Sequence, residues 1–423
     1  KVSYYKKKKF INVKLKGKST LVQILTDNNI IVEISPFIET PSTIPEIDLK
    51  GFLVSPPYVE PHIHLDYVFT AQKDNFQNKT ATLFEGIQCW SEAKSSLTIS
   101  EIKSRALKAL KQQILYGVQY VRTHIDITDP NFTALKALLE IKEELKNIVT
   151  IQIVAFPQEG IYSYKNGDKL LEEALKMGAD CVGGIPHYEL AREIGEKSIH
   201  KIVELATKYN KLIDVHCDET DDSQSRFLEL LNALVYLEGI GKYTTASHTC
   251  SFGSAANSYA FRLMQQLKKS NINFVSCPTE NIYLQGRQDT YPKRRGLTRV
   301  KELYCAGINV CFAQDSILDP WYPLGNGNLM NILDHGIHIS QLMTTNDINN
   351  ALDLITINGA KALNIDDSYG IKCGNNANFI VLDAKNEFDA ICNRASVIAS
   401  IRNGDFLFEK EPAKIKQQIN FLN

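Results

Sequence analysis

Several common signatures are missing from this sequence. No stretch approaches the roughly 20 consecutive apolar residues that a membrane-spanning helix needs. The net charge is −1, from 47 Lys and Arg against 48 Asp and Glu, so no basic excess points to nucleic acid or to an anionic membrane. The start KVSYYKKKKF is basic but no apolar signal-peptide core follows it, and we expect its four lysines to form a solvated tail. These absences favour a cytoplasmic protein that binds neither a nucleic acid polymer nor a membrane.

Paired cysteines are also missing, although the chain has nine cysteines. No C-x-x-C pair occurs, and most cysteines lie in apolar runs, as Cys181, Cys277 and Cys311 do. This pattern is typical of reduced thiols that pack as small hydrophobic residues in the cytoplasm. Cys217 stands beside His216, but neighbours on a strand point to opposite faces, so we expect Cys217 in the core and not as a ligand.

Strand-like segments and turns fill the first 55 residues. FINVKLK, TLVQILT, IIVEISP and GFLVS are separated by Gly, Asn, Asp and Pro, and no helical period of useful length occurs among them. A strand pattern returns near the C-terminus in GIKCGNNANFIVLDAK. We therefore predict a small β-sandwich domain built from residues 1–56 and 369–423, which the rest of the chain interrupts.

Between these segments the chain alternates apolar strands with amphipathic helices. The predicted strands number eight and read VEPHIHL, GVQYVRTHID, IVTIQIVAF, ADCVGG, LIDVHC, TTASH, INFVSCP and INVCFAQDS. The first predicted helix covers 83–115. Eight β/α units in about 260 residues match a (β/α)8 TIM barrel of the α/β class, which we predict over residues 57–368. A doubly wound open sheet is the alternative, but no Gly-rich phosphate fingerprint follows any strand.

The first barrel strand carries two histidines in the stretch GFLVSPPYVEPHIHLD, residues 51–66. Its three prolines disfavour helix, so His62 and His64 should lie on extended backbone and point to the same side. Both imidazoles could then reach a single first-row metal ion. Taken alone, H-x-H is more often a pair of core or surface histidines, so the rest of the chain must decide.

Polar residues gather where the predicted strands end, which is where TIM barrels carry their active sites. In strand order they are His62 and His64, His124 and Asp126, Gln158 and Glu159, His187, His216 and Glu219, His248, Glu280 and Asn281, and Asp315. Six of the nine histidines lie there, and a purely structural role gives no reason for this. The pattern predicts a catalytic metal site.

Four predicted ligands are His62, His64, His216 and Asp315, because strands one, five and eight converge on one side of the barrel mouth. Three histidines and a carboxylate leave room for a water molecule, whose pKa a metal lowers from about 15.7 to roughly 7–9. Asp315 could also accept the proton of that water.

Two further residues complete the predicted chemistry. Glu219 is the second acid/base, since a nitrogen leaving group must be protonated, and His248 could hold the developing oxyanion. A two-metal site usually needs a lysine at the end of strand four, and CVGGIPHYE has none, so we expect one divalent ion per chain. His124 and His187 are expected behind the ligands or in the core, with ligation or substrate contact as the open alternative.

Several motifs resemble the cytosine deaminase family of the amidohydrolase superfamily, over nearly the whole chain. They are TLFEGI (82–87), VRTHID (121–126), IVAFPQEG (153–160), IDVHCDE (213–219), ASHT, LQGRQDTYPKRRG (284–296) and DPWYPLG (319–325). The resemblance implies a hydrolase that deaminates free cytosine to uracil and ammonia in pyrimidine salvage. It also implies one Fe²⁺ or Zn²⁺ ion per chain and assembly as a homo-oligomer, a hexamer in the family.

The resemblance assigns roles by motif. It implies His62, His64, His216 and Asp315 as metal ligands, Glu219 and His248 as the acid/base and polarising groups, and Gln158 as the substrate-binding amide. A carboxamide suits this last role because it can pair with an adjacent carbonyl and N–H of the ring. Trp321 is expected to wall the pocket with its flat indole.

The chain departs from the family directly after the last ligand. Family members usually carry a second acid there, whereas Ser316 follows Asp315. The shorter, neutral side chain removes a charge near the exocyclic amine or the C5 edge and leaves space, so a 5-substituted base such as 5-methylcytosine could be accepted or preferred. Isoguanine and creatinine deaminases of the same superfamily use much the same ligands and stay open as alternatives. A non-catalytic barrel scaffold is more remote, since no ligand or acid is lost.

Overall fold

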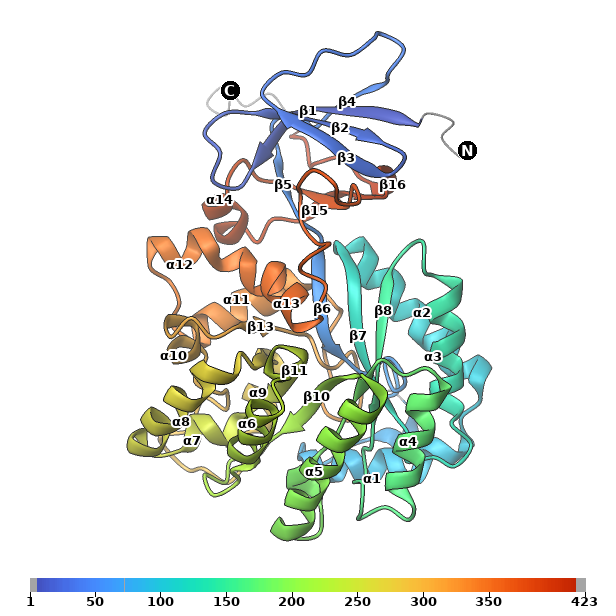
Figure 1. Ribbon diagram of the computed structural model, residues 1–423, viewed down its shortest axis with the longest axis vertical. Coiled ribbons are helices and arrows are strands. Elements are labelled where there is room, and N and C mark those ends of the chain that lie inside the picture. Colours follow the sequence, from blue (N-terminus) through green and yellow to red (C-terminus); the bar gives the residue numbers. More distant parts are fainter. Residues whose placement is uncertain (1–5, 72, 416–423) are drawn as a thin grey trace. The chain divides into compact units, whose positions relative to one another are not determined.

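The computed structural model describes residues 6–71 and 73–415, and it divides the chain into two compact units (Figure 1). One unit comprises Lys1–Pro57 with Gly370–Asn423, and the other comprises Tyr58–Tyr369. The predicted α/β class, with a TIM barrel and a small β-domain from both ends of the chain, is confirmed. Among the described residues, no helix combines the length and the apolar composition that crossing a membrane requires.

The first unit is built on one mixed sheet of eight strands. They are β1 (Lys7–Leu15), β2 (Val22–Asp27), β3 (Ile30–Ser35), β4 (Glu46–Asp48), β5 (Leu53–Ser55), β14 (Phe379–Leu382), β15 (Val397–Arg402) and β16 (Asp405–Glu409), and helix α14 (Glu387–Cys392) follows β14. Strand β5 joins the two chain segments, because it pairs in parallel with β1 and antiparallel with β14. Phe10 and Phe379 meet edge to face in the shared core, with ring centroids 5.0 Å apart.

The lysines near the start do not form a solvated tail. Lys7 begins β1, and Lys9 is buried, with its ammonium paired to Glu46 of β4 at 2.5 Å. The prediction was wrong because a lysine can lie on a strand when a carboxylate from the neighbouring strand compensates its charge. Residues 1–5 of the expected tail lie outside the described residues.

The second unit contains eight parallel strands that pair in chain order. They are β6 (Tyr58–Ile63), β7 (Val118–Asp126), β8 (Thr150–Phe156), β9 (Cys181–Val182), β10 (Leu212–Cys217), β11 (Thr244–His248), β12 (Asn273–Ser276) and β13 (Val310–Phe312). The ends of the first and last strands meet: Asp315 N donates to His62 O at 2.9 Å, and His64 N donates to Asp315 O at 3.2 Å. These two bonds bring together the chain segments on which three of the predicted ligands lie.

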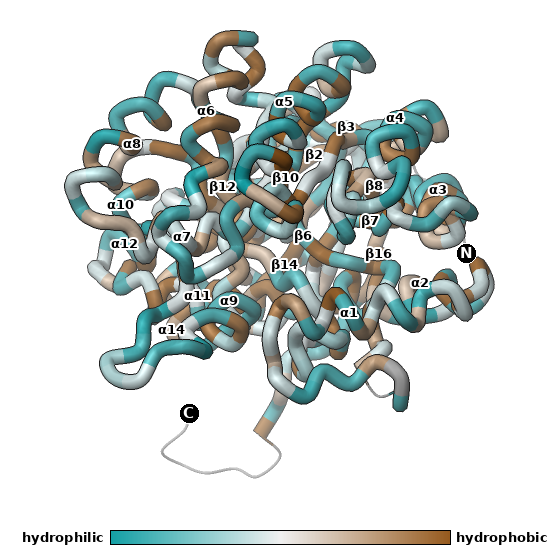
Figure 2. The backbone as a smooth tube through the Cα atoms, turned by 90° about the horizontal axis from the view of Figure 1, so that it is seen from below, coloured by the Kyte–Doolittle hydropathy of each residue, from teal (hydrophilic) through white to brown (hydrophobic). Residues whose placement is uncertain are grey.

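Helices surround these strands (Figure 1) and alternate hydrophobic with hydrophilic residues along their length (Figure 2). They are α1 (Leu83–Ala93), α2 (Ile99–Leu115), α3 (Thr133–Glu144), α4 (Gly167–Met177), α5 (Arg192–Tyr209), α6 (Phe227–Leu237), α7 (Cys250–Ser254), α8 (Asn257–Ser270), α9 (Pro278–Leu284), α10 (Val300–Cys305), α11 (Leu329–Ile339), α12 (Thr345–Asn350) and α13 (Ile357–Ala362). Short 3-10 turns are η1 (Asp74–Phe76), η2 (Lys94–Ser96), η3 (Pro186–Tyr188), η4 (Gly241–Tyr243) and η5 (Ala351–Ile355). The segment 83–115 is two helices, because the Thr98 side chain accepts from Glu101 N and begins α2.

Gly241 opens the turn that leads into β11, and it gives a test of how tightly this part of the barrel is packed. A Cβ at Gly241 would lie 1.7 Å from the carbonyl oxygen of Ser270 at the end of α8. We expect Gly241→Ala to lower the free energy of unfolding by about 3 kcal/mol or more, since backbone atoms must move. The measurement is thermal or urea unfolding followed by circular dichroism.

Gly307→Ala is the matched control. Gly307 has φ +74° but no atom within 4 Å of the added Cβ, so only backbone strain of about 1 kcal/mol is expected. Equal losses of stability in the two variants would contradict the close approach at Gly241.

Candidate metal centre and substrate pocket

Four ligand-type side chains converge at the carboxyl ends of the barrel strands. His62 lies on β6 and His64 follows it, His216 lies on β10, and Asp315 follows β13. The Nε2 atoms of His64 and His216 are 3.2 Å apart. Asp315 Oδ1 lies 3.4 Å from His62 Nε2 and 3.3 Å from His64 Nε2. All four side chains are buried, so the structure brings together the four residues predicted as ligands.

This spacing fits a divalent first-row metal ion. Metal–ligand bonds of about 2.0–2.1 Å in a tetrahedron place the donor atoms roughly 3.3–3.4 Å apart. His62 Nε2 is buried and has no hydrogen-bond partner among the described residues, which is unfavourable unless another group satisfies it. Burial lowers the pKa of His64 to about 4, which keeps its imidazole in the neutral form that binds metal. The cluster is therefore a candidate divalent-metal site.

Two further sets of donor atoms share residues with this cluster: one shares His62 and Asp315, and the other shares His62 alone. In one, His248, Cys277 and Asp315 lie with His62 such that one atom from each falls within 4.8 Å of the others. The Cys277 thiol, which the sequence placed in the core, thus lies within reach of the metal centre. The overlap means that donor proximity alone does not choose the ligands.

The other set comprises His62, His124 and Asp214. Asp214 Oδ2 already pairs with Arg122 Nη1 at 3.0 Å, and this guanidinium disfavours a second cation beside the carboxylate. The His124 ring centroid is 3.9 Å from that of His62, so His124 lies against a candidate ligand. Among the described residues, His187 joins none of the three donor sets.

Glu219 and His248 face each other beside the candidate ligands. Glu219 Oε2 lies 3.3 Å from His248 Nε2. Asn281 of α9 contacts both: its Nδ2 donates to Glu219 Oε1 at 3.3 Å, and its Oδ1 lies 3.1 Å from His248 Nδ1. Since the amide nitrogen faces a carboxylate, the amide oxygen must accept from His248 Nδ1–H. His248 Nε2 is then the nitrogen that can exchange a proton with Glu219.

The electrostatics of this pair favour a retained proton. Burial raises the pKa of Glu219 well above its usual range, and the negative charge of Asp315 raises it further. Burial lowers the pKa of His248 to about 3. These shifts favour a proton on the carboxyl group, beside a neutral imidazole.

The backbone turns sharply at two of these residues. His248 has φ 70° and Asp315 has φ 67°, both in the left-handed region. This conformation is uncommon for residues other than Gly, although Asp and His adopt it more often than most, and it costs about 1–3 kcal/mol in general. The two side chains meet at the carboxyl ends of β11 and β13, which β12 separates, and His248 Nε2 lies 3.8 Å from Asp315 Oδ2.

An aromatic wall carries the predicted substrate-binding residues. Gln158 is buried, and its Oε1 accepts from the Tyr67 hydroxyl at 3.4 Å. The Tyr67 ring stacks on His64 with centroids 4.6 Å apart and packs against Trp321 at 4.4 Å. Trp321 Nε1 donates to Leu83 O of α1 at 3.2 Å. Gln158 and Trp321 thus lie on one wall beside the histidines, linked by Tyr67, which the sequence reasoning missed although it follows HIHLD directly.

Ser316 lies among buried carboxyl groups. Burial raises the pKa of Glu280 well above its usual range and that of Asp319 to about 8, while hydrogen bonding to Ser316 lowers both. Glu280 Oε2 and Asp319 Oδ2 have no hydrogen-bond partner among the described residues. The sequence pattern gave no sign that Asp319 would lie here, because nothing in DPWYPLG fixes how that loop folds back.

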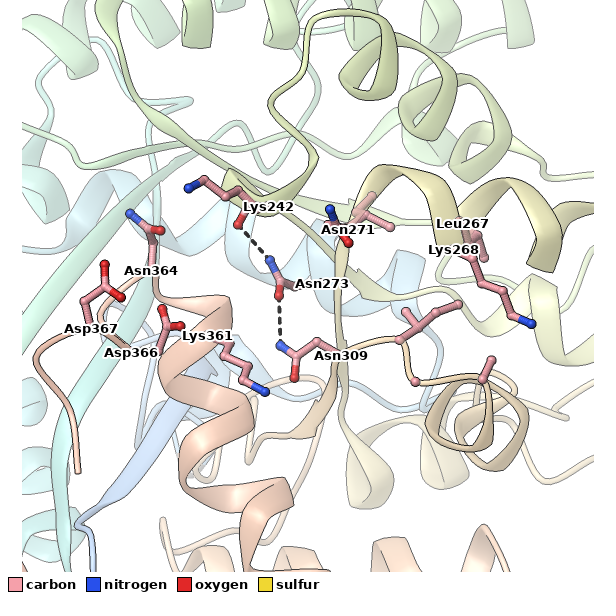
Figure 3. Close-up of a pocket in the computed structure, with 14 residues that line it drawn as sticks. Lys242, Leu267, Lys268, Asn271, Asn273, Asn309, Lys361, Asn364, Asp366 and Asp367 are labelled. Carbon is pink, nitrogen blue, oxygen red and sulfur yellow. Dashed lines mark hydrogen bonds between the residues drawn. The ribbon is translucent and has the colours of Figure 1, made fainter. Parts of the chain in front are cut away.

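A separate pocket of about 450 Å³ lies at the amino ends of the strands (Figure 3). Asn309 Nδ2 donates to Asn273 Oδ1 at 2.8 Å, and Asn273 Nδ2 donates to Lys242 O at 3.1 Å. These amides satisfy each other and the backbone, and none of the candidate ligands lines the pocket. A structural role, in which these amides hold the amino ends of the strands in place, is sufficient to explain them.

Comparisons with known proteins identify the family to which the chain belongs. A family model described as the amidohydrolase family matches residues 45–408. N-isopropylammelide isopropyl amidohydrolase of Pseudomonas sp. (strain ADP) is 30% identical over 408 residues, covering 95% of this chain and 96% of that protein.

Two solved structures have the same architecture. The 5-methylcytosine deaminase from Klebsiella pneumoniae, liganded with 5-fluorocytosine, has a TM-score of 0.94 and 50% sequence identity, covering 97% of this chain and 99% of that chain. N-isopropylammelide isopropylaminohydrolase from Burkholderia multivorans ATCC 17616 has a TM-score of 0.83 and 22% identity, covering 96% and 99%. With the family match over most of its length, this chain belongs to the amidohydrolase family and is a hydrolase that acts on C–N bonds.

Proposed function

We propose that the protein is a metal-dependent deaminase of free cytosine bases that prefers 5-methylcytosine and also accepts cytosine. The observation that carries the proposal is the 50% identity, over 97% of the chain, to a protein described as a 5-methylcytosine deaminase. Hydrolysis at C4 would release ammonia and give thymine from 5-methylcytosine or uracil from cytosine. Either product would enter pyrimidine salvage.

In this proposal His62, His64, His216 and Asp315 hold one divalent ion, Fe²⁺ or Zn²⁺. When bound, such an ion supplies an activated water at neutral pH. Burial alone would raise the pKa of Asp315, but the imidazoles of His62, His64 and His248 hold it well below its usual range. Asp315 therefore stays ionised and can accept the proton of the attacking water.

Glu219 supplies the proton that the ring nitrogen needs. Its raised pKa favours the protonated carboxyl, which can donate to N3 as the nucleophile adds to C4. The leaving amine takes a second proton, the one that Asp315 accepts from the attacking water. His248 Nε2 lies 3.8 Å from Asp315 Oδ2 and 3.3 Å from Glu219 Oε2, so it can relay this proton between the two carboxyl groups and the amine. Because Asn281 accepts from its Nδ1, His248 can stabilise an oxyanion only while Nε2 is also protonated.

Gln158 orients the base through its ring edge. The carboxamide can accept from a ring N–H and donate to the adjacent carbonyl. Tyr67 donates to Gln158 Oε1, and this fixes which end of the amide is the acceptor. The flat ring of Trp321 closes the same wall, so the planar base would lie between aromatic and imidazole surfaces.

The backbone at Gln158 is held by a buried charge network. Asp126 Oδ1 lies 3.4 Å from Gln158 N, and Asp126 Oδ2 accepts from Trp90 Nε1 at 2.8 Å and from Lys94 Nζ at 2.9 Å. Lys94 also pairs with Glu159, the neighbour of Gln158. Lys94 thus connects η2 to the end of β8, and we assign it the positioning of Gln158.

Ser316 supports the preference for a methylated base. Its side chain is shorter than the acid that the related cytosine deaminases carry after the ligand, and it is uncharged. At residue 316 itself, a methyl group at C5 would therefore meet neither an added carboxylate to desolvate nor a longer side chain to displace.

The direct test is ammonia release from 5-methylcytosine, cytosine, isoguanine and creatinine by the protein loaded with Fe²⁺ or Zn²⁺. We expect the highest kcat/KM with 5-methylcytosine and measurable turnover of cytosine. Glu219→Gln should lower kcat about 100-fold or more, because an amide cannot supply the proton. Glu238→Gln, on the exposed end of α6, is the control and should leave kcat unchanged. Turnover of isoguanine or creatinine alone would overturn the substrate assignment and leave the hydrolytic chemistry standing.

The role of Ser316 is tested by Ser316→Asp and Ser316→Ala. The aspartate adds a fourth carboxyl group beside Asp315, Glu280 and Asp319, so we expect the ratio of kcat/KM for 5-methylcytosine over cytosine to fall about tenfold or more. Ser316→Ala stays short and uncharged and should keep the wild-type ratio. An unchanged ratio in Ser316→Asp would remove the argument from this residue.

The positioning role of Lys94 is tested by Lys94→Met, which keeps the length of the side chain and removes its charge. We expect KM for the base to rise about tenfold with a smaller change in kcat, since the substitution weakens binding through Gln158 more than it slows the chemical step. Lys103→Met is the matched control, because Lys103 pairs with Glu140 and Glu144 on the helix surface. A larger fall in kcat than rise in KM would contradict this assignment.

A further inference from the structure

A chain of buried polar groups leads from His62 into the barrel interior. His62 Nδ1 lies 3.0 Å from Ser247 Oγ, and the Ser247 hydroxyl donates to Asp214 Oδ1 at 2.7 Å. Asp214 Oδ2 accepts from Arg122 Nη1 at 3.0 Å, and Arg122 Nη2 donates to Ala362 O at 2.9 Å. The four side chains from His62 to Arg122 are fully buried.

The direction of these hydrogen bonds sets the tautomer of His62. Ser247 spends its single proton on Asp214, so its oxygen can only accept from the histidine ring. The ring proton must then lie on Nδ1, and Nε2 is left with a lone pair. That nitrogen has no hydrogen-bond partner among the described residues and lies 3.4 Å from Asp315 Oδ1, on the side of the candidate metal centre.

We propose that Ser247 is a positioning residue that holds His62 in its metal-binding tautomer and orientation, with Asp214 and Arg122 fixing the hydroxyl of Ser247. This inference rests on the metal centre proposed above. Histidine ligands commonly donate their second ring N–H to a carboxylate or a similar acceptor, which orients the ring. Here a serine stands between the ring and the carboxylate.

The arrangement also accounts for a single ion. The ionised guanidinium of Arg122 occupies the cation position beside Asp214, so the carboxylate is already compensated and serves as an acceptor for Ser247. His62 therefore has one nitrogen for the metal and the other for the protein. In this arrangement no ion binds at the donor set of His62, His124 and Asp214.

Ser247→Ala tests the proposal, because it removes the hydroxyl and leaves the Asp214–Arg122 pair in place. The measurement is the Kd for Zn²⁺, from competition between the full-length, metal-stripped protein and a chromogenic chelator. We expect one Zn²⁺ per wild-type chain, and a Kd about 10- to 100-fold higher in Ser247→Ala. Once saturated with Zn²⁺, the variant should keep a KM for its base close to that of the wild type.

The matched control is Ser276→Ala, at the end of the neighbouring strand β12. Ser276 is also fully buried, but its Oγ has no hydrogen-bond partner among the described residues, so its loss should leave the Kd unchanged. Ser247→Thr restores a hydroxyl and should recover the wild-type Kd. Asp214→Asn, whose amide oxygen is a weaker acceptor for the same hydroxyl, should raise the Kd in the same direction by a smaller factor.

The outcomes separate the two proposals. A wild-type Kd in both Ser247→Ala and Asp214→Asn overturns the positioning role, as does an equal rise in Ser276→Ala. If the wild-type protein binds no Zn²⁺, the metal centre itself is overturned, and the role of Ser247 is overturned with it.

Discussion

The candidate site depends on the contact between the first and last strands of the barrel. Asp315 N donates to His62 O and His64 N donates to Asp315 O, and these two backbone bonds join segments that are far apart in the sequence. Three of the four candidate ligands, His62, His64 and Asp315, are the residues that make this contact. The geometry of the centre is therefore set by the backbone, and the side chains need only short reaches. This explains how the buried imidazoles of His62 and His64 can meet the Asp315 carboxylate at 3.3–3.4 Å without a flexible loop to carry them.

Much of this arrangement follows from the sequence, because it obeys simple rules. Strands that are buried on both faces consist almost entirely of apolar residues. Parallel strands in a barrel present their carboxyl ends at one face. Those two rules, applied to His62, His216 and Asp315, predict that the three side chains meet. The strand count and the presence of a β-domain from both chain ends followed from the same alternation of patterns.

What the sequence does not reveal is which buried polar groups pair across the barrel. Arg122 and Asp214 stand out as charges inside apolar strands, but they are separated by several β/α units, and no spacing rule connects them. Tyr67 is adjacent to the metal motif, yet its contact with Gln158 depends on the path of the chain after β6. The break before α2 was missed because apolar periodicity continues across it, and only the cap at Thr98 marks the new helix.

The sheet of the smaller unit has a consequence for synthesis on the ribosome. Strand β5 is made early, but one of its two neighbours is β14, which emerges only after the whole barrel segment. The barrel strands can close as soon as Asp315 has left the exit tunnel, whereas β5 waits with one edge unpaired. During that interval the nascent chain carries a strand edge that its final partner has not yet covered.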